Sequence, residues 1–156
     1  YEKLLKEIIS QPLAMKNTGI TLATTDSSAF AQGYRGETAV HSWEFVSLVA
    51  AGGIRSNVND MLLYAKAQLD GGNSTLDKAI ALAQQQTWEK SGTRVCLGWH
   101  LISRNGKSYL FHNGQTGGYY TVLLVNSVTK NAVVMLTNAL VDPMPTALDL
   151  ISWLDQ

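Results

Sequence analysis

The sequence has little charge and few of the residues that mark special chemistry. Its single cysteine, Cys96, excludes an intrachain disulfide and is expected to be a buried, unreactive thiol. No apolar run approaches the roughly 18 residues that a bilayer-spanning helix needs. Charged residues make up only 15% of the chain, and 12 basic residues balance 12 acidic ones without a dense run of either sign. We therefore expect no nucleic-acid partner and no polybasic membrane patch.

Motifs for several common chemistries are also missing. The chain has no Gly-x-Ser-x-Gly, no His-Glu-x-x-His and no phosphate-binding loop. His41, His100 and His112 are far apart in the sequence without ligand spacing, so we expect no metal and no other cofactor. The low charge has two explanations: a surface of neutral polar residues, or a surface that other chain normally covers. Because the chain starts inside a predicted helix at Tyr1, we expect a truncated or cleaved product.

The first part of the chain, residues 1–94, is predicted to be mostly helix and loop. Residues 2–10 have one apolar face and end at Pro12. Residues 13–50 show no sustained period and are predicted to be a long connector, with one short strand near 30–34. Ser56 or Asn57 is expected to cap a helix that Gly71 and Gly72 end, and a second helix is predicted from 75 to about 86.

From Val95 the apolar period changes from that of a helix to that of a strand. Residues 95–103 and 108–112 flank Asn105-Gly106, a strong signal for a two-residue hairpin. A second hairpin joins 119–126 to 132–137, and Thr146 is expected to cap a final helix. The predicted fold class is α+β, an antiparallel β-meander with flanking helices, in a single partial domain over 1–156.

The segment most relevant to function runs from His112 to Tyr119, between two predicted strands. Gly114, Gly117 and Gly118 weaken a strand because they cost entropy and offer no side chain for packing. One explanation is a wide hairpin loop. The other is a strand edge without side chains, which a ligand can approach and which can donate backbone N–H groups.

This segment resembles the Lys-Thr-Gly-x-Thr-Gly-Gly-aromatic strand of class C β-lactamases and of related DD-peptidases and esterases. Three further segments resemble that family in the same order. They are Ile9–Met15, Ala50–Met61 and Val133–Asn138. The resemblance covers nearly the whole chain and implies the C-terminal part of a β-lactamase/transpeptidase-like fold.

The resemblance also implies roles for individual residues. His112 would take the position of the family's third-motif cation and orient a substrate carboxylate, although a histidine is charged only part of the time near pH 7. The backbone N–H of Gln115 would be the oxyanion-hole donor. These two residues are the catalytic candidates, and Asn113, Gly114, Gly117 and Gly118 are the candidates for substrate binding.

The family's nucleophile, in Ser-x-x-Lys at the start of a helix, is absent. The only such string, from Ser127 to Lys130, falls in a predicted turn and is attributed to chance. We therefore expect an inactive fragment of a hydrolase for β-lactams or for D-alanyl peptides or esters. His112 in place of lysine, and Asp142 near the position of a carboxylate-recognising asparagine, favour a DD-peptidase-like or esterase-like parent. The alternative is a non-catalytic module that binds cell-wall peptide.

Two further expectations concern partners and location. The missing strands of the sheet should leave an exposed edge and an apolar face, so we expect the N-terminal part of the same protein, or a second copy, as partner. The resemblance implies a periplasmic or extracellular protein.

Overall fold

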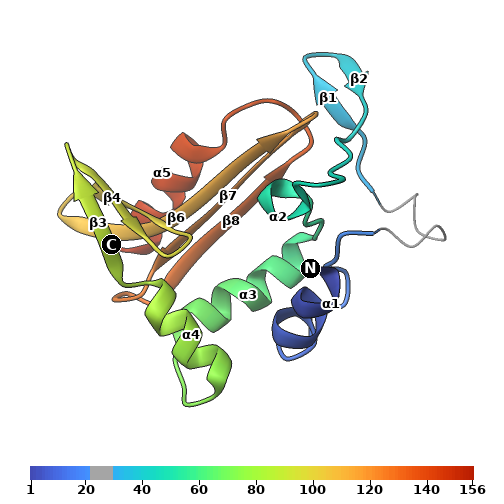
Figure 1. The fold of residues 1–156 in the computed structure, drawn as a ribbon. Helices are drawn as coiled ribbons and strands as arrows, with labels where there is room; N and C mark the ends of the chain where they lie inside the picture. The colour runs from blue at the N-terminus through green and yellow to red at the C-terminus, as the bar shows by residue number, and fades with distance from the viewer. Residues whose placement is uncertain (22–29) are drawn as a thin grey trace.

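The computed structural model describes residues 1–21 and 30–156 (Figure 1). The elements in chain order are α1 (Glu2–Leu5), the π-helical turn η1 (Lys6–Ser10), β1 (Gly33–Arg35), β2 (Thr38–Val40), α2 (Val49–Gly52), α3 (Val58–Asp70), α4 (Thr75–Ala83), β3 (Gln86–Lys90), β4 (Thr93–Cys96), β5 (His100–Arg104), β6 (Lys107–Thr116), β7 (Tyr119–Asn126), β8 (Asn131–Thr137) and α5 (Met144–Leu154). None of these helices is long and apolar enough to cross a membrane.

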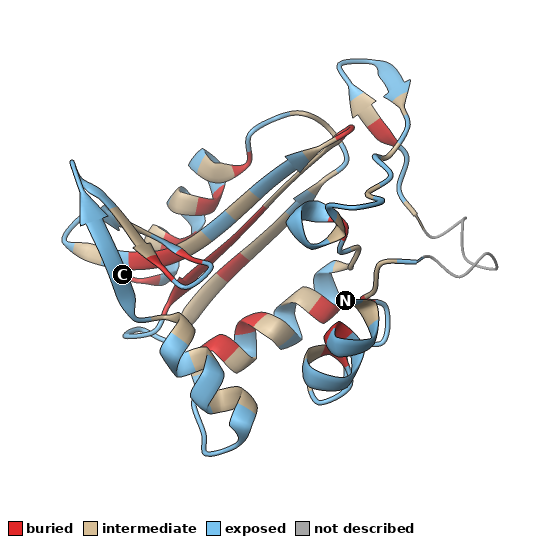
Figure 2. Ribbon diagram, in the orientation of Figure 1, coloured by how far each residue is buried: buried red, intermediate tan, exposed pale blue. Residues whose placement is uncertain are grey.

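A six-stranded antiparallel sheet with the order β3-β4-β5-β6-β7-β8 forms the body of the fold. Helix α3 lies in front of the sheet and α5 behind it (Figure 1). Alternate residues of β7 face the two helices, so Leu123 and Val125 pack on the α3 side while Val122 and Leu124 pack on the α5 side. Figure 2 shows the buried residues along the central strands and on the inner sides of both helices. The predicted α+β class, an antiparallel meander with flanking helices, is confirmed.

Local sequence signals account for several of these elements. The side chain of Asn57 caps α3 by accepting a hydrogen bond from the Asp60 backbone N–H at 2.9 Å, and the helix ends at Gly71 with φ +69°. Asn105 and Gly106, with φ +52° and +75°, form the two-residue turn between β5 and β6. Cys96 is buried as expected, and burial raises the pKa of its thiol against a smaller lowering by Arg94.

Two predicted elements are wrong in their extent. Residues 95–103 are two strands, because the chain turns at Gly98 with φ +81° and the Cys96 N–H donates to the Trp99 carbonyl at 2.8 Å. The second helix ends at Ala83, since residues from Gln86 onward pair with β4 as strand β3. Glutamine favours helices locally, but this pairing overrides the preference.

Smaller departures from the predictions lie at the two ends of the chain and in the predicted connector. The predicted helix over 2–10 is a short α-helix followed by a π-helical turn, in which Leu5 is buried and Ile8 is exposed. Thr146 lies inside α5 and does not cap it. Instead, the Asp142 carboxylate accepts from the Met144 N–H at 2.9 Å. The predicted connector contains β1, β2 and α2, of which only β1 overlaps the expected strand.

Candidate active site

Strands β5 and β7 pair with β6 over different stretches, which overlap only at Leu110 and Phe111. Strand β5 pairs with residues Lys107–Phe111 of β6, whereas β7 pairs with β6 as far as Thr116. Among the described strands, none pairs with residues 112–116 on the β5 side. The family-like segment is therefore strand as far as Thr116, followed by a two-residue turn, and is not a wide loop. Its outer edge is open.

The ladder register determines which backbone groups face this open edge. Alternate residues of an antiparallel strand hydrogen-bond to the same neighbour. Thr116 and Tyr119 close the two-residue turn between β6 and β7, so Thr116, Gly114 and His112 face β7. The backbone N–H and C=O groups of Asn113 and Gln115 therefore point outward along the open edge.

The side chain of His112 lies beside a second imidazole. The ring centroids of His100 and His112 are 6.2 Å apart, and that of His100 is 5.3 Å from that of Phe111. Although His112 is exposed to solvent, the surrounding protein disfavours the imidazolium. This desolvation, and then the nearby His100, lower the pKa of His112 against a smaller opposing effect of a hydrogen bond with Asn113.

The structure brings His100 and His112 close together although they are separated in the sequence. His100 reaches His112 because β5 pairs with β6, which the sequence spacing does not reveal. The described residues contain no group of three or more potential metal ligands.

The glycines of the segment lie in different surroundings. A Cβ atom on Gly117 would lie 2.6 Å from Cδ1 of Trp43 and 2.7 Å from the His41 carbonyl oxygen. A Cβ on Gly118 would lie 2.8 Å from Cα of Gly33. Gly117 and Gly118 thus make room for residues 33–43. Gly114 remains exposed, and the nearest atom to its Cβ position, on Thr121, is 3.9 Å away.

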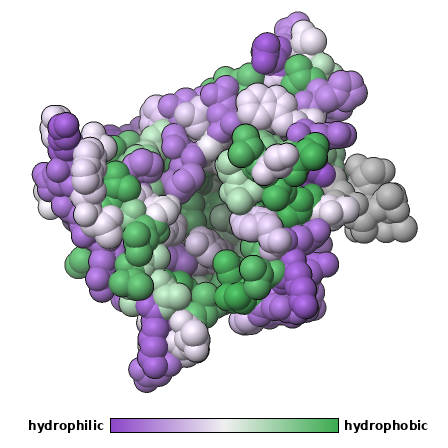
Figure 3. All heavy atoms as spheres, in the orientation of Figure 1, coloured by the Kyte–Doolittle hydropathy of each residue, from purple (hydrophilic) through white to green (hydrophobic). Residues whose placement is uncertain are grey.

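A cleft of about 820 Å³ lies beside the open edge. The space-filling view in Figure 3 shows a hollow near the middle of the visible face, with hydrophobic residues around it. Arg55 and His112 are the only basic residues among the described residues that line the cleft, and these lining residues include no carboxylate. The site is therefore mostly apolar, with backbone groups as its main polar contacts.

A buried carboxylate fixes one side of the cleft to α3. The Asp60 side chain accepts hydrogen bonds from the Asn17 N–H at 2.7 Å and from the Thr18 hydroxyl at 2.8 Å. The same hydroxyl lies 2.7 Å from Oγ of Ser56. Thr18 and Ser56 both line the cleft, so this network holds their loops in place.

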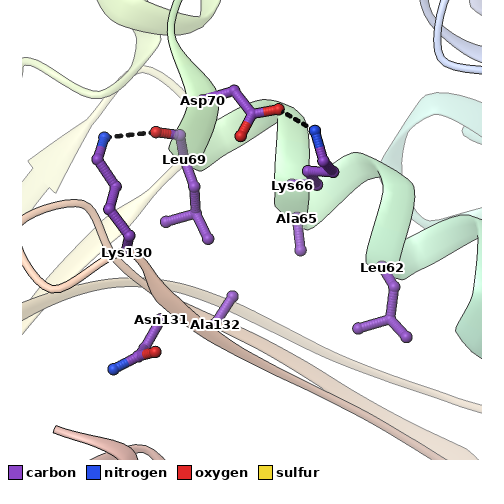
Figure 4. A pocket seen from close by; sticks show the side chains of 8 residues that line it. All are labelled: Leu62, Ala65, Lys66, Leu69, Asp70, Lys130, Asn131 and Ala132. Carbon is purple, nitrogen blue, oxygen red and sulfur yellow. Dashed lines mark hydrogen bonds and ion pairs between the residues drawn. The ribbon is translucent and has the colours of Figure 1, made fainter.

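The Ser127–Lys130 string lies in the turn between β7 and β8, as predicted. Lys130 has φ +61°, and its ammonium group donates to the Leu69 carbonyl oxygen. Figure 4 shows this contact at a smaller hollow of about 550 Å³ between α3 and the start of β8, which contains no residue of the His112–Tyr119 segment. This contact with the end of α3 fits a structural role for Lys130.

Sequence reasoning missed four residues at the site, namely Trp43, Phe45, Arg55 and His100. Trp43, Phe45 and Arg55 line the cleft, and His100 contacts the His112 ring. Arg55 and its neighbours did carry a signal, since they lie in a family-like segment. Trp43 and Phe45 lie in a stretch without periodicity, and only their contacts with distant glycines reveal their position.

Comparison with known proteins gives consistent results over most of the chain. The family model described as beta-lactamase matches residues 1–155. A beta-lactamase of Escherichia coli (strain K12) is 29% identical over 105 residues, which are 65% of this chain and 28% of that protein. A beta-lactamase of Yersinia enterocolitica is 29% identical over 108 residues, 66% of this chain and 28% of that protein. The chain thus matches little more than a quarter of the length of these relatives.

Proposed function

This chain belongs to the beta-lactamase family, and from that premise we propose that it forms one wall of the acyl-transfer cleft of a serine hydrolase. The substrate would be a β-lactam or a D-alanyl peptide or ester. The observation that carries this proposal is the open edge of β6 at residues 112–116, where the backbone of Gln115 faces outward beside a cleft. An edge of this kind can pair with an extended substrate and can stabilise an oxyanion.

In the proposed reaction, a serine hydroxyl outside these 156 residues adds to the substrate carbonyl carbon. The carbonyl oxygen becomes an oxyanion, which accepts a hydrogen bond from the Gln115 N–H. Collapse of this intermediate expels the leaving amine or alcohol, which takes up the proton from the serine. Water then hydrolyses the acyl-serine ester and regenerates the hydroxyl. Asn113 would pair with the substrate through its outward backbone groups.

His112 would contribute as a hydrogen-bonding imidazole at the end of the cleft. Its lowered pKa supports a mostly neutral ring at pH 7, in contrast to the permanent charge of a lysine. A neutral ring binds a substrate carboxylate weakly. Because β-lactams and D-alanyl-D-alanine peptides both carry a carboxylate at this end, the neutral ring favours an esterase-like parent, whose substrate needs no carboxylate.

We also propose that the cleft is completed by chain outside these residues. The outer edge of β8, seven residues long, pairs with no described strand. Large apolar side chains are also exposed, among them Ile54 and Val58 in the lining of the cleft and Leu4, Ile8 and Leu62 elsewhere on α1, η1 and α3. Such an edge and surface favour association. The partner would be the preceding part of the same protein or, without it, a second copy. A single monomeric species by light scattering would contradict this.

The function can be tested on the polypeptide that includes the preceding segment. We expect it to hydrolyse nitrocefin or a D-alanyl ester, and we expect this chain alone to be inactive. Activity that survives replacement of the serine in the preceding Ser-x-x-Lys by alanine would overturn the proposal. Binding of cell-wall peptide without turnover would favour the non-catalytic alternative. Because cell-wall peptide lies outside the inner membrane, the same proposal places the protein in the periplasm or outside the cell.

A further inference from the structure

Two exposed histidines meet where β5 begins beside β6. His100 is the first residue of β5 and pairs with Phe111, and His112 follows Phe111 on β6. The ring centroids of His100 and His112 are 6.2 Å apart, with 41° between their planes. Both side chains are exposed, so a small solute can reach either ring. Two imidazoles therefore lie side by side at the margin of the cleft, which His112 lines.

The distance between the two rings suits a single metal ion bound to both. A transition metal binds a histidine nitrogen at about 2.0–2.1 Å, which places the metal about 3.2 Å from the ring centroid. Two rings on one ion then have centroids about 5.2 Å apart at a tetrahedral angle and about 6.4 Å apart when they lie opposite each other. The observed 6.2 Å lies in this range, and rotation of two exposed side chains can shorten it.

The hydrogen bonding of His112 leaves one of its nitrogens available to a metal. The His112 ring hydrogen-bonds to the Asn113 backbone, which engages one ring nitrogen. An imidazole has two ring nitrogens, so the other remains free to bind a ligand. Metal-binding histidines commonly make such a bond through the second nitrogen, because it fixes the orientation of the ring. The Asn113 backbone therefore holds the His112 ring as a metal ligand requires.

The surroundings of the two rings determine which metals would bind. The described residues that line the cleft include no carboxylate. Mg²⁺ and Ca²⁺ prefer oxygen ligands and would therefore not be held there. Cu²⁺, Ni²⁺ and Zn²⁺ bind imidazole nitrogen, and Cu²⁺ binds most tightly of these three ions. Two imidazoles would be the protein ligands, and water would complete the coordination.

We propose, against the expectation from the sequence spacing, that His100 and His112 together bind one transition-metal ion of the class that prefers imidazole. Once one ring holds the ion, the second ring is close by, and such linked binding exceeds binding to a single ring by roughly 10²–10⁴-fold. The ion would also take the free nitrogen of His112 away from a substrate. The metal is therefore expected to inhibit acyl transfer reversibly, a consequence that, unlike the site itself, rests on the proposed function.

Titration of the 156-residue chain with CuCl₂ tests the site, with calorimetry for the affinity and electron paramagnetic resonance for the ligands. We expect one tightly bound ion whose spectrum shows coupling to two imidazole nitrogens. His100→Ala and His112→Ala each remove an exposed ring and should fold, and each should weaken binding by about 100-fold. His41→Ala is the matched control, because His41 is an exposed histidine outside this pair, and it should keep the parent affinity. MgCl₂ should show no binding.

The outcomes separate the metal site from the proposed function. No tight binding, an unchanged affinity in His100→Ala or His112→Ala, or an equal loss in His41→Ala each overturn the site. Turnover of a D-alanyl ester is measured separately, on the polypeptide that includes the preceding segment, with CuCl₂ and then with excess chelator. Tight binding that leaves turnover unchanged supports the metal site and counts against His112 as a substrate contact. Tight binding without any turnover supports the site and contradicts acyl transfer.

Discussion

The two halves of strand β6 share one backbone path but have opposite surroundings. Residues Lys107–Phe111 pair with β5, Leu110 and Phe111 among them also pair with β7, and this half includes Tyr109, which is only 1% exposed. Residues 112–116 lie beside β7 alone and face a cleft. The first half stabilises the sheet and holds the second half in its extended conformation. An exposed strand edge is unfavourable by itself, but this support keeps it available for a ligand.

The largest expected difference between the two halves is in stability. Tyr109→Ala removes a fully buried ring and should lower the free energy of unfolding by about 3–5 kcal/mol. His112→Ala removes an exposed ring and should change it by less than about 0.5 kcal/mol. Urea denaturation of the two variants measures both values. Equal destabilisation by the two substitutions would contradict the division of β6.

A buried carboxylate near the C-terminus stabilises the turn between β7 and β8. Asp155 accepts hydrogen bonds from Asn126 at 2.6 Å, Thr129 at 2.5 Å and Asn131 at 2.7 Å. Asp155→Ala leaves these donors without their acceptor and should cost about 2–3 kcal/mol. Ser152 lies nearby on α5, and Ser152→Ala is a milder control because its hydroxyl donates to the Leu148 carbonyl within the same helix.

The same carboxylate predicts a pH dependence of stability. Burial raises the pKa of Asp155, but the hydrogen bonds from Asn131, Thr129 and Asn126 outweigh it, so the pKa is lowered in the folded state. Its contribution to stability is therefore complete above the unfolded pKa of about 3.9 and is lost as the pH falls through the folded value. Thermal melts from pH 6 to pH 2 should show a smaller acid-induced loss for Asp155→Asn than for the parent chain. Identical losses would contradict this role.

Gly114 in the open half and Gly117 in the turn that follows it give a smaller contrast. Gly117→Ala would place a methyl group 2.6 Å from the Trp43 ring and should cost about 1–3 kcal/mol. Gly114→Ala meets no atom closer than 3.9 Å and should change stability by less than about 0.5 kcal/mol. Denaturation curves distinguish the two. If Gly114→Ala destabilises the fold more than Gly117→Ala does, the assignment of Gly117 as covered and Gly114 as open is wrong.

The smallest expected effect concerns His112. Its NMR titration midpoint should lie below the ordinary histidine value of about 6.5, and His100→Ala should raise it by removing the neighbouring charge. His41 belongs to the segment after β2, and His41→Ala should leave the His112 midpoint unchanged. A His112 midpoint at or above the ordinary value would argue for a lysine-like cation.

Local sequence signals predicted the framework that positions the open edge. Asn57 and Gly71 marked the ends of α3, Asn105-Gly106 marked the β5–β6 turn, and alternation marked β7 and β8. The split at Gly98 was missed because apolar alternation continues through the turn. Sequence patterns reveal apolar periods and helix caps, but they do not show where one strand extends beyond its neighbour.

The surroundings of the site were less predictable. The contact between His100 and His112 depends on the register of β5 with β6, and the contact between Trp43 and Gly117 joins residues that are far apart in the chain. The resemblance predicts Gln115 as an oxyanion donor, but the sequence does not show the outward direction of its backbone groups. The structure adds the reason for that direction, which is the alternation of the ladder with β7.

The most direct test of the account removes a single backbone hydrogen. In the polypeptide that includes the preceding segment, Gln115→Pro deletes the outward N–H, and Gln115→Ala deletes the side chain but keeps the N–H. Proline is tolerated at a strand edge where the N–H has no ladder partner, so both variants should fold. We predict that Gln115→Pro lowers kcat for a D-alanyl ester by about 100–1,000-fold while Gln115→Ala stays near the parent value. Equal activity of the two variants would contradict the open edge of β6 as the oxyanion-stabilising wall.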